Sequence, residues 1–132
     1  MKKAAVFFIF IGVVFALMFS YTAQLERESA QRMAGVIKEN EVTMLNFGAE
    51  LCPPCEEMQP VLEEVYMEYE DRVHFPYVDI REHIDLARQL GVRTTPTQIF
   101  FDHTGNERYR HEGFMEKQAI RDILENLLSA GS

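Results

Sequence analysis

The sequence is poor in several residue types that mark common functional classes. It has only two cysteines and four histidines in 132 residues, and the histidines match no metal-ligand spacing. A zinc site would need two or more ligands beyond the cysteines, so we expect no metal. Basic residues are also scarce, because 13 lysines and arginines stand against 21 acidic residues, for a net charge of −8. Such a chain repels nucleic acid, which we exclude as a partner.

The longest apolar run lies at the N-terminus. Residues 4–19 are all apolar or glycine, Lys2 and Lys3 precede them, and the first acidic residue is Glu26. A charged start, an apolar middle and a polar exit are typical of a secretory signal or a membrane anchor. With residues 20–23 the run reaches the roughly 20 residues that a membrane span needs. We therefore interpret residues 1–23 as an N-terminal membrane anchor or signal segment.

An uncleaved anchor is the first interpretation of this segment. Cleavage after Ala23 would put Tyr21 at a position that requires a small residue. A cleaved signal and a buried core helix remain as alternatives. Lys2 and Lys3 favour the cytoplasmic side, so we expect a single anchor in the cytoplasmic (inner) membrane, with the rest of the chain outside the cytoplasm.

Beyond the anchor, helical and strand patterns alternate. Residues 24–40 have helical spacing and are predicted to form a stalk or first helix, and residues 41–132 a single α/β domain. The elements expected in this domain are strands over 42–47, 73–80, 97–101 and 108–114, and helices over 55–71, 84–90 and 120–128. Strands separated by helices pair in parallel, and the last two form a hairpin, so the sheet should be mixed, four-stranded and flanked by helices. Pro76 cannot donate to a ladder, which places residues 73–80 at an edge.

The two cysteines lie three positions apart, between the first strand and the next helix, in the segment GAELCPPCEEMQP (48–60). A helix N-terminus favours a thiolate, so we expect Cys52 to be the attacking nucleophile, with a lowered pKa. Cys55, one turn later and more buried, would be the resolving thiol. Pro53 and Pro54 fit the first two helical positions, where an N–H has no partner, and would leave the N–H of Cys55 to bond a capping sulfur.

The acidic neighbours of the cysteines indicate the direction of the chemistry. No basic residue is near in sequence, and three carboxylates are: Glu50, Glu56 and Glu57. Negative charge disfavours a thiolate, so the predicted poise is reducing. A structural disulfide and copper transfer through the thiols and Met58 are the alternatives for this pair.

With these features the chain resembles the thioredoxin family, in which C-x-x-C follows a strand and precedes a helix. Pro60, the segment TTPT (94–97), and Gly113 with Phe114 agree with this resemblance, which covers about residues 30–128. It implies that Thr95–Pro96 is cis, that the Thr95 backbone pairs with an extended substrate, and that Pro96 shapes the docking surface. A tight turn entering a strand is the alternative for Pro96.

Some positions depart from the family pattern. Leu51 replaces a tryptophan, Asn46 a buried aspartate that moves protons, and Phe75 a lysine; the first strand of the full fold is expected to be absent. Asn46 cannot act as a base, so proton transfer would rely on water or on Glu50.

The anchor, TPTQIFFD (95–102) and RHEGF (110–114) resemble extracytoplasmic bacterial thioredoxin-like proteins. This implies a membrane-tethered thiol–disulfide oxidoreductase facing the periplasm that reduces disulfides of exported proteins. Its partners would be those proteins and a membrane thiol transporter that supplies electrons, with no cofactor beyond the Cys52–Cys55 couple. A disulfide oxidase or isomerase, and a non-catalytic copper-binding or interaction module, are the alternatives.

Overall fold

The computed structural model describes the backbone of residues 2–131 and the side chains of residues 7–27, 33 and 35–131. The chain divides into two compact units, Met1–Met33 and Ala34–Ser132.

The first unit is helical. Helix α1 (Lys2–Val36) runs without a break, so the anchor and the predicted helix over 24–40 are one element that ends four residues early. Its segment Phe7–Arg27 is long and apolar enough to cross a membrane, with a mean hydropathy of 1.9 and none of that window buried. Length and composition are the grounds for this assignment, and a secretory signal would meet the same criteria.

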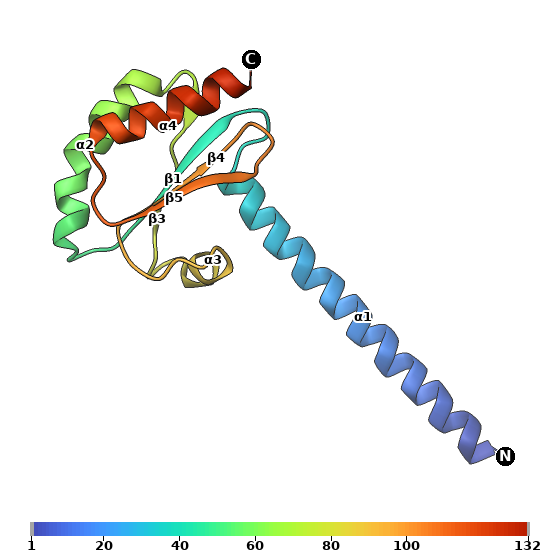
Figure 1. Ribbon diagram of the computed structural model, residues 1–132. Coiled ribbons are helices and arrows are strands. Elements are labelled where there is room, and N and C mark those ends of the chain that lie inside the picture. The colour runs from blue at the N-terminus through green and yellow to red at the C-terminus, as the bar shows by residue number, and fades with distance from the viewer. Residues whose placement is uncertain (1, 132) are drawn as a thin grey trace. The chain divides into compact units, whose positions relative to one another are not determined.

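The second unit is built on a mixed sheet (Figure 1). The strands are β1 (Val42–Gly48), β2 (Val73–His74), β3 (Tyr77–Asp79), β4 (Thr97–Phe101) and β5 (Glu107–Glu112). Strand β1 pairs in parallel with β2 and β3 and antiparallel with β4, which forms a hairpin with β5. The spatial order is β2-β1-β4-β5, with β3 beside β1 on the same side as β2. Among residues 2–41 there is no strand, as expected from the sequence.

The predicted strand over 73–80 is interrupted, and this corrects the four-stranded count. Phe75 and Pro76 separate β2 from β3, so five strands occupy four positions in the sheet. Pro76 has no N–H to donate, but its carbonyl accepts a hydrogen bond from the N–H of Asn46 at 2.9 Å. The interrupted segment lies at the edge of the sheet, where the proline predicted it.

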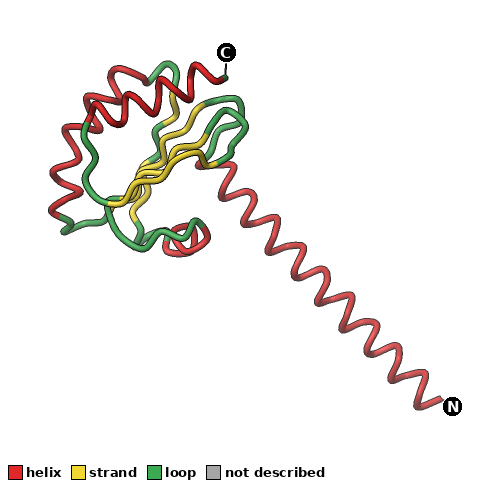
Figure 2. Tube along the Cα trace, in the orientation of Figure 1, coloured by secondary structure: helices red, strands yellow, loops and turns green. Residues whose placement is uncertain are grey.

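Three helices complete the second unit: α2 (Pro53–Tyr69), α3 (Ile84–Gln89) and α4 (Lys117–Ala130). Figures 1 and 2 show α2 and α4 on one side of the sheet and α3 on the other. Met58 of α2 and Leu124 of α4 are fully buried in a core with Met44 and Phe100 of the sheet. Every residue of β1 is buried, as is typical of a central strand covered on both faces. The core thus fixes α2 against the strand that precedes it.

Candidate active site

The site begins at the turn from β1 to α2. Cys52 is the N-cap of α2, with an extended backbone (φ −115°, ψ 96°), and Pro53 and Pro54 occupy the first two helical positions as predicted. Leu51, just before the cap, has φ +57° and a side chain that is 90% exposed. A non-glycine residue in this left-handed region is strained, and exposed apolar surface adds to its cost. Both features lie next to the outer thiol.

The two sulfurs differ in exposure. Cys52 and Cys55 are joined by a disulfide, with their Cα atoms 5.2 Å apart. Cys55 is 6% exposed, whereas Cys52 is half-buried and is the accessible member of the pair. An incoming thiol or disulfide would therefore meet Cys52 first.

The predicted bond from the Cys55 N–H to the capping sulfur is wrong for this oxidised form. That N–H donates to the backbone carbonyl of Cys52 at 2.9 Å, and the Glu56 N–H donates to the same oxygen at 3.1 Å. The Cys52 side chain makes no cap hydrogen bond. The carbonyl satisfies the first turn of α2, while the sulfur is held in its bond to Cys55.

The segment before β4 lies against the outer sulfur. Thr95–Pro96 is a cis peptide, as the resemblance implied. The hydroxyl of Thr95 donates to Cys52 Sγ at 3.5 Å, and the Gly113 N–H donates to the carbonyl of Pro96 at 2.7 Å. Pro96 is buried and Thr95 is half-buried. Residues more than 40 positions apart in sequence are thus brought together at one sulfur.

Glu50 is placed differently from its predicted surroundings. It is paired with Arg81, whose Nη2 lies 2.8 Å from Glu50 Oε2 and 3.2 Å from Asp79 Oδ2. The hydrogen bonds from Arg81 lower the pKa of Asp79, and those to Asp79 and Glu50 raise the pKa of Arg81. The Glu50 side chain is 74% exposed, so it is open to water.

Sequence reasoning missed Arg81 because it lies 31 positions from Glu50. A signal existed, since both residues follow strands predicted to run in parallel, and the carboxyl ends of parallel strands meet at one edge of a sheet. The turn before Cys52 is therefore less negative than the local sequence indicates.

Asn46 lies in β1, where the resemblance would place an aspartate. It is 6% exposed, and its Oδ1 accepts a hydrogen bond from Gln98 Nε2 of β4 at 3.2 Å. A neutral amide fits this buried position because no charge has to be desolvated. Within the described side chains, no group of three or more His, Cys, Asp or Glu residues is arranged to hold a metal ion.

Comparison with known proteins agrees with this geometry. A sequence model of the family "Thioredoxin" matches residues 24–126. The thioredoxin of Acidithiobacillus ferridurans is 30% identical over 93 residues, which cover 70% of this chain and 85% of the relative. The thioredoxin of Borreliella burgdorferi is 28% identical over 83 residues, which cover 63% of this chain and 70% of the relative.

A solved structure shows the same similarity in three dimensions. A mutant thioredoxin from Halobacterium salinarum superimposes with a TM-score of 0.66 at 27% identity, covering 73% of this chain and 82% of that one. The matched sequence model, the relatives and the pair of thiols at disulfide distance lead to one assignment. This chain belongs to the thioredoxin family and is a protein-disulfide oxidoreductase.

Proposed function

We propose that this protein is a membrane-tethered reductase of disulfides in exported proteins. The observation that carries the proposal is the position of Cys52, which is accessible at the N-terminus of α2 and accepts the Thr95 hydroxyl bond, with Cys55 buried behind it. The helix N-terminus and the hydroxyl both stabilise negative charge on the outer sulfur. Cys52 is therefore the thiol suited to begin the exchange.

The reaction proceeds in two exchanges. The Cys52 thiolate attacks one sulfur of the substrate disulfide, forms a mixed disulfide and releases the other substrate sulfur as a thiolate. Cys55 then loses its proton and attacks Cys52, which releases the second substrate thiolate and closes the Cys52–Cys55 bond. Two electrons pass to the substrate, and a dithiol of the membrane thiol transporter restores the reduced form. Glu50 is exposed and accepts the Cys55 proton through water.

Docking of the substrate uses the segment before β4. The Thr95 backbone pairs with an extended stretch of substrate, and Pro96 shapes the surface beside Cys52. The N–H of Gly113, the residue that follows β5, donates to the Pro96 carbonyl and so holds this segment beside the end of the sheet.

Trapping of the mixed disulfide tests the assigned roles. The full chain with Cys55→Ser should accumulate a covalent adduct with insulin, because no resolving thiol is present to release it. The matched Cys52→Ser variant should give none. Adducts would be counted on non-reducing gels and by mass spectrometry. Equal trapping by both variants, or by neither, would contradict these roles.

The proposed extracytoplasmic location of the site is supported by α1 and is tested separately. The apolar segment Phe7–Arg27 is the proposed anchor, with Lys2 and Lys3 on the cytoplasmic side. A membrane-impermeant maleimide added to intact bacterial cells expressing the chain should label Cys52 after mild reduction, with Cys52→Ser as the blank. Labelling only after lysis would overturn the extracytoplasmic placement.

The direction of the reaction depends on the poise of the couple. We propose a reducing poise, because Glu56 and Glu57 remain exposed beside the thiols while Arg81 offsets Glu50. A redox titration should place the couple near the thioredoxin value of about −270 mV. A value near the about −120 mV of a strong oxidant would instead make the protein a disulfide oxidase.

A further inference from the structure

The edge of the sheet at β3 has backbone groups that β1 does not use. Asn46 N donates to Pro76 O, and Ile80 N donates to Gly48 O, which fixes the alternation of the parallel ladder. By this alternation the N–H and carbonyl of Tyr77 point away from β1. Among the described residues, none lies beyond β3 in the sheet to bond them. This edge can therefore accept another strand.

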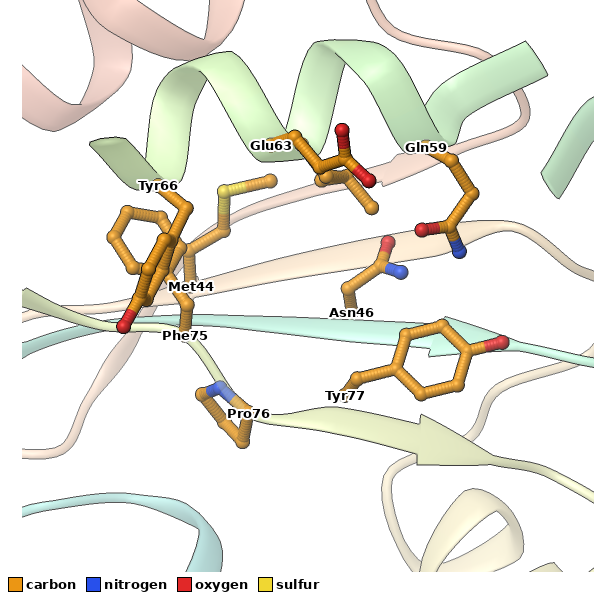
Figure 3. Close-up of a pocket in the computed structure, with 9 residues that line it drawn as sticks. Met44, Asn46, Gln59, Glu63, Tyr66, Phe75, Pro76 and Tyr77 are labelled. Atoms are coloured by element: carbon orange, nitrogen blue, oxygen red, sulfur yellow. The ribbon is translucent and has the colours of Figure 1, made fainter. Parts of the chain in front are cut away.

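A pocket of about 340 Å³ lies between this edge and α2 (Figure 3). Met44 forms part of its lining on β1, and Leu62 and Tyr66 line it from α2. Phe75 and Tyr77 line it from the edge, and Phe75 packs edge-to-face on Tyr66 with ring centroids 5.9 Å apart. A strand added beside β3 would direct alternate side chains to the α2 face, which is the side on which the pocket lies.

The polar groups of the pocket define what would fill it. The Asn46 side chain is buried, with 6% of it exposed. Within the described residues it makes one side-chain hydrogen bond, in which its Oδ1 accepts from Gln98. Its Nδ2 donor is therefore available to an acceptor in the pocket, beside the amide of Gln59 (Figure 3). Glu63 is exposed at the pocket, and among the described residues no lysine, arginine or histidine lines the pocket. The complementary ligand is apolar, offers a carbonyl and carries a cation nearby.

We propose that this edge and pocket bind an extended segment of a partner polypeptide as an added strand. Its backbone pairs with Tyr77, one aromatic or long aliphatic side chain fills the pocket, and a neighbouring lysine or arginine meets Glu63. Strand addition provides affinity through main-chain bonds and specificity through the pocketed side chain. A second copy of this chain fits less well, because the described lining of its own pocket offers no lysine or arginine to meet Glu63.

This surface is separate from the disulfide. None of the residues that line the pocket is Cys52, Cys55, Thr95 or Pro96. A partner held at β3 would therefore leave the outer thiol free to react. The proposal does not depend on the direction of the thiol chemistry.

The test uses the oxidised full chain in detergent micelles and a fluorescein-labelled peptide without cysteine, Lys-Thr-Phe-Thr-Val-Thr-Lys. Fluorescence anisotropy should show saturable binding, and the ¹³C-methyl signal of Met44, assigned with Met44→Leu, should shift. Replacing the peptide's phenylalanine by alanine should weaken binding about 10-fold or more, the loss expected for one buried aromatic side chain. N-methylation of the peptide backbone should abolish binding at one set of alternate positions and be tolerated at the other.

The charge contribution has a matched pair of protein variants. A peptide with both lysines replaced by glutamate should bind several-fold more weakly to the unaltered chain. Glu63→Gln should remove this preference. Glu64→Gln should keep it, because Glu64 is bonded to Lys117 at 2.8 Å and does not line the pocket.

Four results would overturn the proposal. The first is that the peptide shows no saturable binding at millimolar concentration, and the second is that N-methylation of the peptide has no effect on binding. The third is that the peptide shifts the signals of Thr95 and leaves that of Met44 unchanged. The fourth is a Met44 signal that changes with protein concentration in the absence of peptide. The last would show that a second copy occupies the edge. Insulin reduction measured on the same preparation after dithiothreitol is added as the electron donor reports separately on the thiol chemistry, so failure of one proposal is distinguishable from failure of the other.

Discussion

The hydroxyl of Thr95 donates to Cys52 Sγ at 3.5 Å, and so connects the segment before β4 to the N-terminus of α2. The same hydroxyl is available to the thiolate once the disulfide is reduced. Thr95→Val keeps the shape of the side chain and removes the donor. A hydrogen bond to a charged group contributes about 1.5–3 kcal/mol, and one pKa unit corresponds to about 1.4 kcal/mol.

We therefore predict that Thr95→Val raises the pKa of the Cys52 thiol by about one to two units. The pH dependence of thiolate absorbance in the reduced full chain measures this. Thr94→Val is the matched control, because Thr94 is exposed. Thr97 donates to the backbone carbonyl of Thr94, which the substitution leaves in place. An unchanged Cys52 pKa in Thr95→Val would show that the contact has no role in the reduced form.

Arg81 gives a second prediction about the same thiol. Arg81→Gln leaves the Glu50 and Asp79 carboxylates without their cation, so the pKa of Cys52 should rise. The shift should be smaller than that of Thr95→Val, because the pair with Glu50 is exposed to solvent and screened. Glu50→Gln should act in the opposite direction. A fall in the Cys52 pKa in Arg81→Gln would contradict this electrostatic account.

Leu51 links stability to function. Leu51→Gly should raise the free energy of unfolding by about 1 kcal/mol, because glycine adopts positive φ without strain. It should also lower kcat/KM for insulin reduction, because it removes apolar surface next to Cys52. Leu51→Ala keeps the strained backbone and should lose activity without gaining stability. Urea unfolding and insulin turnover measure the two effects, and full activity in both variants would exclude a docking role for this side chain.

The stability of the oxidised protein should depend on pH through His74. The pKa of His74 is lowered mainly because burial desolvates the charged ring, and in addition because the positive charge of Lys38 lies nearby. The folded state therefore favours the neutral ring. Its contribution to stability is present above the unfolded pKa of about 6.5 and is lost as the pH falls through the lower folded pKa.

Unfolding by urea at a series of pH values between 7.5 and 5 tests this. The unaltered chain should lose stability over that range, and His74→Gln should lose less. His83→Gln, at an exposed position, is the control. Three carboxyl groups also have lowered pKa values, those of Asp79, Asp102 and Glu107. The stability that they contribute is lost at more acidic pH, as these groups become protonated. Identical pH profiles for the unaltered chain and His74→Gln would contradict the prediction.

Much of the second unit was predictable because its signals are local. The alternation of strand and helix patterns predicts the sheet, its hairpin and its three helices. The proline at position 76 predicts an edge, but not the two-residue gap that separates β2 from β3. The two strands nevertheless keep one register on β1, with Thr43 opposite His74 and Asn46 opposite Tyr77, a relationship across the sheet that no local pattern specifies.

The site shows the same division. The C-x-x-C segment and the Pro-Pro pair predict the helix start at Cys52, because capping preferences are local. The pairing of Arg81 with Glu50 depends on two strand ends that lie side by side. The contact of Thr95 with Cys52 depends on a fold that brings together residues 43 positions apart. The predicted sulfur cap was wrong because the carbonyl of Cys52 satisfies the first turn of α2.

Site-resolved alkylation measures whether the N-terminus of α2 keeps Cys52 ionised while Cys55 is shielded. The reduced full chain would be treated briefly with iodoacetamide at pH 7, and the modification of each cysteine would be quantified by mass spectrometry against an unstructured peptide thiol. We expect Cys52 to react faster than the peptide and Cys55 to stay unmodified. A Cys52 that reacts no faster than the peptide, or a Cys55 that reacts first, would contradict this expectation.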